Sequence, residues 1–159
     1  MAITQANTAQ GIERSSDQFS TFFVADLFFG VDVLQVQEVL RHQPMTPVPQ
    51  SPDVIEGLIN LRGQIVTAID MRRRLKLPCR PVELSPMNIV VSGSDGAVSL
   101  LVDEIGDVIQ VDASTFELPP ANLNPIAKLI VRGVYKLNHQ LLLVLDAERT
   151  VDLSLGISP

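Results

Sequence analysis

This chain of 159 residues has little of what disulfides, stacking sites and nucleic-acid surfaces require. Cys79 is its single cysteine, so no disulfide can form within the chain, and we expect a reducing compartment. Aromatic residues make up 4% of the sequence and tryptophan is absent, which predicts a mainly aliphatic core. The net charge of -6 disfavours nucleic acid as a partner, because phosphate binding requires clustered lysine and arginine.

Long apolar segments are also missing. Residues 1–17 are polar and aperiodic, lack the apolar core of a signal peptide, and are expected to form a mobile tail. No apolar run approaches the roughly 20 residues that span a bilayer. The sequence therefore predicts a cytoplasmic protein without direct membrane insertion.

No pattern in the sequence indicates an enzyme, a cofactor site or a metal site. A glycine-rich phosphate loop, a GxSxG motif and a CxxC motif are all absent. His42 and His139 lie in expected loops and lack the spacing of metal ligands. Asp103, Glu104 and Asp107 could hold a divalent cation, but carboxylates at strand ends are more often solvated.

What the chain does have is a well-defined stretch over residues 57–75, GLINLRGQIVTAIDMRRRL. Two apolar runs flank Arg62 and Gly63, which is typical of a tight β-hairpin because glycine supplies the positive φ angle of the turn. Asp70 can cap a following helix by accepting a hydrogen bond from a backbone N–H. This stretch predicts strand, turn, strand, cap and short helix.

Short apolar runs separated by turns continue on both sides of this stretch. QFSTFFVA and LFFGVDV predict a hairpin, and VLQVQEVL predicts either a strand or an extended connector. Four prolines exclude a helix or a central strand over residues 43–52. MNIVVSG and AVSLLVDEI predict another hairpin, DVIQVD a strand, and AKLIVRGVYKL with QLLLVLD a last strand pair.

The chain contains an internal repeat. Residues 57–73 align without gaps on residues 133–149, and the matched pairs include Gly57 with Gly133 and Asp70 with Asp146. Two related small β-units that pack together would explain the repeat, because packed barrels leave few exposed sheet edges. The copies differ at the turn, where Arg62-Gly63 in the first corresponds to Asn138-His139 in the second. Arg62 is therefore a candidate for function rather than for folding.

A basic cluster follows the first hairpin and has two interpretations. Arg72, Arg73, Arg74 and Lys76 could form the solvent face of a short helix, where cations near the C-terminus are favoured. Alternatively they could form a docking patch for an acidic partner. We favour the first interpretation, because one helical turn offers little surface.

NLRGQIVTAIDMRRRL, preceded by VIEGLI, closely resembles the signature hairpin of the CheW family, the coupling proteins of bacterial chemotaxis. The resemblance extends through FGVDVLQVQEV and LLVDEIGDVI and covers residues 18–152. It implies a mainly β fold of two SH3-like five-stranded β-barrels around a shared hydrophobic interface, with short helical turns. We expect the first barrel at about 18–82, the second at 83–152, and a C-terminal tail at 153–159.

The resemblance also implies a function. Family members are adaptors without catalysis or cofactors, and they join the cytoplasmic signalling tip of chemoreceptors to the regulatory domain of a histidine kinase in membrane-associated arrays. Matching positions imply a partner-binding surface formed by Val33, Val36, Glu38, Arg62 and Gly63, with Leu101 and Val102 in a groove between the barrels. Two alternatives stay open: an interaction module of another pathway, such as pilus-driven motility, or a small-molecule-binding double barrel.

Overall fold

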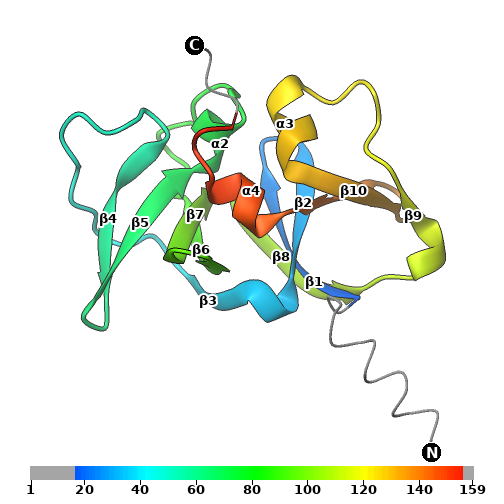
Figure 1. The fold of residues 1–159 in the computed structure, drawn as a ribbon, viewed down its shortest axis with the longest axis horizontal. Helices are drawn as coiled ribbons and strands as arrows, with labels where there is room; N and C mark the ends of the chain where they lie inside the picture. Colours follow the sequence, from blue (N-terminus) through cyan, green and yellow to red (C-terminus); the bar gives the residue numbers. More distant parts are fainter. Residues whose placement is uncertain (1–16, 156–159) are drawn as a thin grey trace, which may run out of the picture.

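The computed structural model describes residues 17–155, which form two β-sheets and several short helices (Figure 1). The tails expected at residues 1–17 and 153–159 lie mostly outside the described residues. Within the described part, no helix combines the length and the apolar character needed to cross a membrane.

The first sheet has six strands, in the order β8 (Glu104–Gln110), β1 (Gln18–Val24), β2 (Leu27–Asp32), β11 (Leu141–Leu145), β10 (Val131–Lys136) and β9 (Phe116–Glu117). The second has five, in the order β3 (Val36–Leu40), β6 (Met87–Gly93), β7 (Gly96–Val102), β5 (Gln64–Asp70) and β4 (Ile55–Leu61). Among the strands of residues 17–155, only the β2–β11 and β5–β7 pairs are parallel. The helices are α2 (Met71–Arg74), α3 (Pro125–Ile130) and α4 (Ala147–Val151), and the 3-10 turns are η1 (Val33–Gln35) and η2 (Ala113–Thr115).

The predicted fold class is confirmed. The first sheet has one strand more than the predicted five, because the two-residue strand β9 lies at its edge. In the second sheet, the segment that follows β3 returns to the outer edge of β4. There Thr46 and Leu58 exchange two backbone hydrogen bonds of 2.9 Å each. This bridge covers an edge that would otherwise expose unpaired backbone groups.

The expected division of the barrels near residue 82 is wrong, because the sheets exchange strands. The hairpin β1–β2 belongs to the first sheet, where it pairs with β8 and β11, whereas β3, β4 and β5 belong to the second sheet with β6 and β7. In Figure 1 the blue hairpin accordingly lies with the orange strands of the C-terminal half. Each sheet thus combines a hairpin from one half of the chain with strands from the other.

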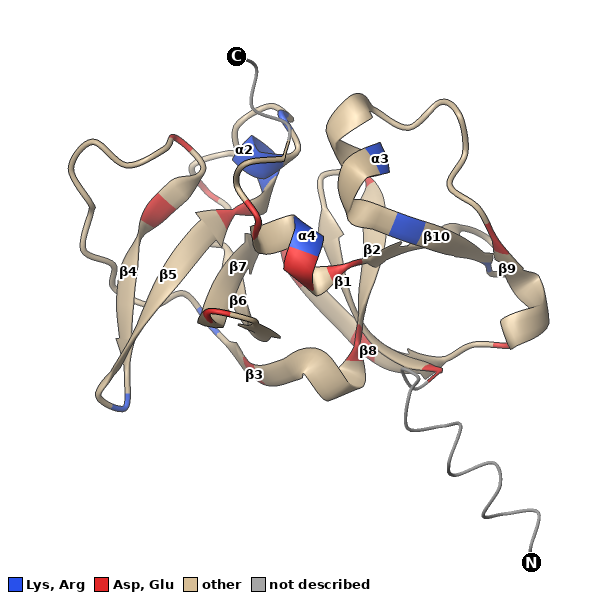
Figure 2. Ribbon diagram, viewed as in Figure 1, with Lys and Arg blue, Asp and Glu red and all other residues tan. Residues whose placement is uncertain are grey.

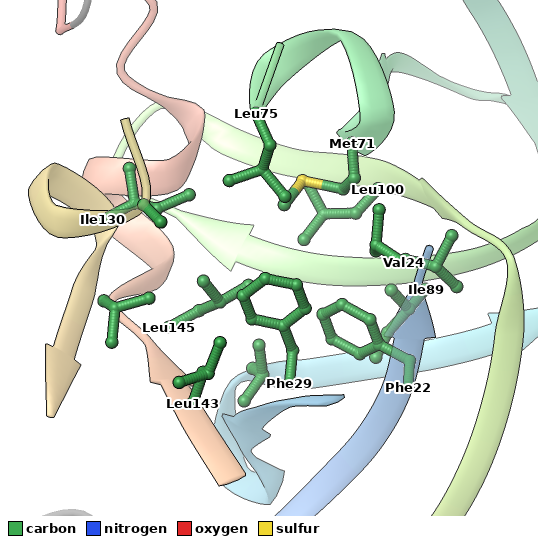
Figure 3. Packing of buried hydrophobic residues seen from close by; sticks show 14 of the residues in the cluster. Phe22, Val24, Phe29, Met71, Leu75, Ile89, Leu100, Ile130, Leu143 and Leu145 are labelled. Atoms are coloured by element: carbon green, nitrogen blue, oxygen red, sulfur yellow. The ribbon is translucent and has the colours of Figure 1, made fainter. Parts of the chain in front are cut away.

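The central strands are buried on both faces, which explains continuous apolar runs such as LLLVL in β11. Phe22 and Phe29 stack with ring centroids 5.7 Å apart in a cluster that takes side chains from both sheets. Met71 of α2 and Ile130 of α3 cover this cluster (Figure 3). Each such large side chain contributes about 1.5–3 kcal/mol by leaving water, so both sheets depend on the same buried cluster.

The predicted strand–turn–strand–cap–helix arrangement is confirmed. Arg62 and Gly63 both have positive φ angles, of 51° and 86°, as a two-residue hairpin turn of the primed type requires. Asp70 accepts a 2.9 Å hydrogen bond from the N–H of Arg72, and Asp146 caps α4 in the same way through Arg149 at 3.1 Å.

Two segments differ from the predictions. VLQVQEVL is neither wholly strand nor connector, because η1 comes first and β3 follows. AKLI belongs to α3 rather than to a strand. Asn124 caps this helix by accepting a 2.7 Å hydrogen bond from Ala127, and Pro125 occupies its first turn, where proline costs no hydrogen bond.

The glycines shared by both repeats allow a close approach of two chain segments. A Cβ atom on Gly57 would lie 2.7 Å from the carbonyl oxygen of Thr46, and one on Gly133 would overlap the ring of Phe116. Each glycine therefore lets the outermost segment of its unit pack against the following strand.

We predict that Gly57→Ala destabilises the protein by about 1–3 kcal/mol, because a backbone oxygen must move to make room for the methyl group. Urea unfolding measures this change. Gly133→Ala provides the comparison in the other unit and should also destabilise. An unchanged unfolding midpoint for Gly57→Ala would show that the close approach is not required.

Candidate partner-binding surface

The hairpin tip bears an exposed ion pair that joins the β4–β5 turn to β3, a strand at the opposite edge of the sheet from β4. Arg62 donates from both terminal nitrogens to the two carboxylate oxygens of Glu38, at 2.7 and 2.6 Å. The side chain of Arg62 is 79% exposed, and that of Glu38 is 21% exposed. The hydrogen bonds and the charge of Glu38 raise the pKa of the Arg62 guanidinium above its ordinary value. The pair thus holds a charged, solvent-facing group in a defined orientation.

Arg62 occupies an unfavourable backbone position. Positive φ angles are rare for residues other than glycine, asparagine and aspartate, because the Cβ atom crowds the following carbonyl. The second repeat builds its hairpin differently, with residues 137–140 between the strands and no positive φ angle. The fold therefore does not require an arginine at this turn. Ala25, Gln50 and Lys76 also have positive φ angles, so it is the exposed ion pair together with the local strain that makes Arg62 a candidate for function.

Exposed apolar side chains flank the ion pair along the chain. Val39 follows Glu38 and is 41% exposed, and Ile65, just beyond the turn, is 60% exposed. Leu34 in η1 is 72% exposed. Figure 2 shows a single basic residue at the hairpin tip, at the opposite end of the sheet from α2. A charged group beside apolar surface is typical of the anchors of protein interfaces.

The residues selected from the sequence fall into two groups. Glu38 and Arg62 are in direct contact, Gly63 is exposed beside Arg62, and Val33 and Val36 are half-buried in η1 and at the start of β3. The exposed Leu34, Val39 and Ile65 were missed, and position next to the selected residues is the only signal that could have indicated them.

Leu101 and Val102 are wrong as groove residues. Both lie near the end of β7, with exposed fractions of 1% and 0%, and they pack into two different core clusters. Because β7 is a central strand covered on both faces, alternate side chains enter different parts of the core. Neither side chain offers surface to a partner.

The basic cluster after the hairpin is divided: its interpretation as a solvent face is wrong for Arg72 and Arg74, whereas Arg73 is partly exposed and Lys76 is exposed. Arg72 donates to Asp103 at 2.6 Å, and Arg80 donates to the same carboxylate at 2.9 Å. The backbone N–H of Ala25 donates to it as well, at 2.7 Å. Asp103 therefore ties α2 and the first hairpin to the crossing between β7 and β8.

Arg74 is buried, and its guanidinium donates to backbone carbonyl oxygens of Arg149, Thr150, Asp152 and Leu155 at 2.9–3.2 Å. Burial lowers the pKa of Arg74, which nevertheless stays charged because arginine titrates far above neutral pH. These carbonyls lie at and beyond the C-terminus of α4, where helical carbonyl oxygens lack their usual donors four residues on. Arg74 thus connects residues 149–155 to α2.

The cation site considered for Asp103, Glu104 and Asp107 does not form in the described residues. The carboxylate of Asp103 is occupied by two arginines. Within residues 17–155, no three His, Cys, Asp or Glu side chains are grouped so as to hold a metal ion.

A double β-barrel with an exposed charged hairpin defines the class of protein, and comparison with known proteins agrees. The family model described as the CheW-like domain matches residues 18–154. The chain belongs to the CheW family.

Named relatives are consistent with this assignment. The chemotaxis protein CheW of Bacillus subtilis is 30% identical over 87% of this chain and 89% of its own length. That of Klebsiella aerogenes is 28% identical over 86% and 82%. The crystal structure of the scaffolding protein TtCheW from Thermoanaerobacter tengcongensis superposes with a TM-score of 0.77 at 27% identity, covering 86% of this chain and 93% of that one.

Asp103 gives a testable pH dependence. Burial alone would raise its pKa, but the hydrogen bonds from Arg72, Ala25 and Arg80 outweigh burial and lower it. Its stabilising contribution is therefore complete above the unfolded pKa of about 4 and is lost as the pH falls through the lower folded value. We predict that Asp103→Asn costs about 3–5 kcal/mol near neutral pH, because two arginines lose a buried partner.

Urea unfolding between pH 2 and 7 measures this effect, and the difference between wild type and variant should shrink below about pH 4. Asp107→Asn, an exposed carboxylate on β8, is the matched control and should change stability little. A pH-independent difference would show that Asp103 acts through packing rather than through its charge.

Proposed function

We propose that this protein is a chemotaxis adaptor that joins the cytoplasmic signalling tip of a chemoreceptor to the regulatory domain of a CheA-type histidine kinase. Membership of the CheW family supports this proposal, together with one observation that carries it. The hairpin tip holds Arg62 in a strained turn, paired with Glu38 and exposed to solvent, where the fold does not need an arginine. Through the receptor, the protein is recruited to membrane-associated arrays.

The exposed ion pair is better suited to binding than to stability. A surface ion pair is screened by water and salt and contributes little to folding. An oriented guanidinium can instead exchange or share its carboxylate with a partner, and its forked donors select planar carboxylate groups. Arg62 with the neighbouring Ile65 therefore provides a compact contact surface with both charge and apolar area.

The adaptor role requires a second surface. The half-buried Val33 and Val36 with the exposed Leu34 form an apolar strip along η1 and the start of β3. Such a strip fits one face of an amphipathic helix, which is the form in which a receptor signalling tip would be presented. Two surfaces of modest affinity assemble strongly when both partners are multivalent.

Binding of purified components tests the proposal. The protein is mixed separately with the regulatory domain of the kinase and with a receptor signalling-tip fragment, and each binary affinity is measured by calorimetry. Binding to neither would contradict the adaptor role. If native co-purification recovers receptors and kinases of another pathway, such as pilus-driven motility, the protein serves that pathway.

We predict that Arg62→Ala leaves the melting temperature nearly unchanged and weakens binding of at least one partner about tenfold or more. Alanine keeps the strained turn and removes the guanidinium. Arg62→Asn is the matched variant, because asparagine accepts the positive φ angle, so it should be at least as stable as wild type and equally weak in binding. A large loss of stability in both variants would make Arg62 a structural residue.

A further inference from the structure

The two halves of this chain are interlocked rather than side by side. A single connection, residues 75–86, joins the part that ends with α2 to the part that begins with β6. Within the described residues, pairs inside one half are limited to the antiparallel pairs β1–β2, β4–β5, β6–β7, β10–β11 and β9–β10. The pairs β1–β8, β2–β11, β3–β6 and β5–β7 all join one half to the other. Neither half contains a complete sheet.

Side-chain hydrogen bonds and apolar contacts also join one half of the chain to the other. Asp103 of the second half receives hydrogen bonds from Ala25, Arg72 and Arg80, which precede it in the first half and the connection. Arg74 of the first half bonds four carbonyl oxygens of the second half, among them that of Thr150. The central apolar cluster also takes residues from both halves, so separating them would expose it to water.

Only the middle of the connection, residues 81–85, carries little of the fold, because Leu75 is buried in the core and Arg80 is paired with Asp103. Residues 81–85 are all exposed, and Val82 is 97% exposed. Asp70 at the end of β5 is paired with Leu101, and Met87 at the start of β6 is paired with Val102 of the same strand. The two ends therefore lie about two strand spacings, or about 10 Å, apart. A short tether keeps the halves at high effective concentration, which favours closure within one chain.

We propose that the surface between the halves is a recognition surface whose second partner is the complementary half of another copy of this chain. When closure within one chain is prevented, the first half of one molecule completes its sheets with the second half of another. The product is a closed assembly, in the simplest case a dimer, that contains two complete double barrels and the same buried contacts.

A rigid insertion tests the proposal on the full chain. A helical spacer of about 40 residues, about 60 Å long, is placed between Val82 and Glu83. The native segment 77–86 spans at most about 35 Å when extended, so it cannot return both ends of the rod to neighbouring strands. We expect a folded dimer or larger closed assembly by light scattering, with the β-type circular dichroism and cooperative melting of the parent.

A flexible Gly/Ser spacer of equal length is the control, because it permits closure within one chain and should give a folded monomer. If the rigid-spacer protein is unfolded while the control folds, the halves do not recognise each other between chains. A folded rigid-spacer monomer would likewise overturn the proposal. Neither result depends on receptor or kinase binding, so this test is independent of the proposed function.

Discussion

The pairing of each half of the chain with the other half is the constraint on which the structure depends. Four strand pairs cross between the halves, and they place the two sheets against one buried cluster. The chain must pass from sheet to sheet after β2 and after β7. At the second crossing, Asp103 accepts hydrogen bonds from two arginines and a backbone N–H, and these bonds compensate for the burial of its charge. The exchange of strands between the two halves of the chain therefore explains both the shared core and the position of the buried ion pairs.

The two kinds of ion pair in this protein have different consequences. The pairs around Asp103 are buried and linked to the crossing, so loss of one partner leaves an uncompensated charge in the interior. The Arg62–Glu38 pair is exposed, and water can replace either partner. The same chemistry is thus structural at one end of the second sheet and available for binding at the other.

Local features were predictable from the sequence, and long-range pairings were not. The 57–75 hairpin and the Asp70 cap follow from turn and capping preferences of neighbouring residues. The repeat indicated two similar units, but similarity between copies cannot tell which copy supplies a neighbouring strand. For the same reason nothing in the sequence predicted that Arg62 meets Glu38, although both were selected separately.

Errors at the candidate site have physical causes as well. Leu101 and Val102 lie in a strand covered on both faces, where a continuous apolar run does not reveal which side chains reach the surface. Arg72 and Arg74 belong to a helix of one turn, too short to show an exposed face by periodicity, and tertiary contacts bury them.

Simultaneous binding is the property that distinguishes an adaptor from a protein with one binding surface. Analytical ultracentrifugation of the protein with the kinase regulatory domain and a receptor signalling-tip fragment measures it most directly. We expect one complex whose mass is the sum of all three components. Displacement of the receptor fragment by the kinase domain would contradict the adaptor function.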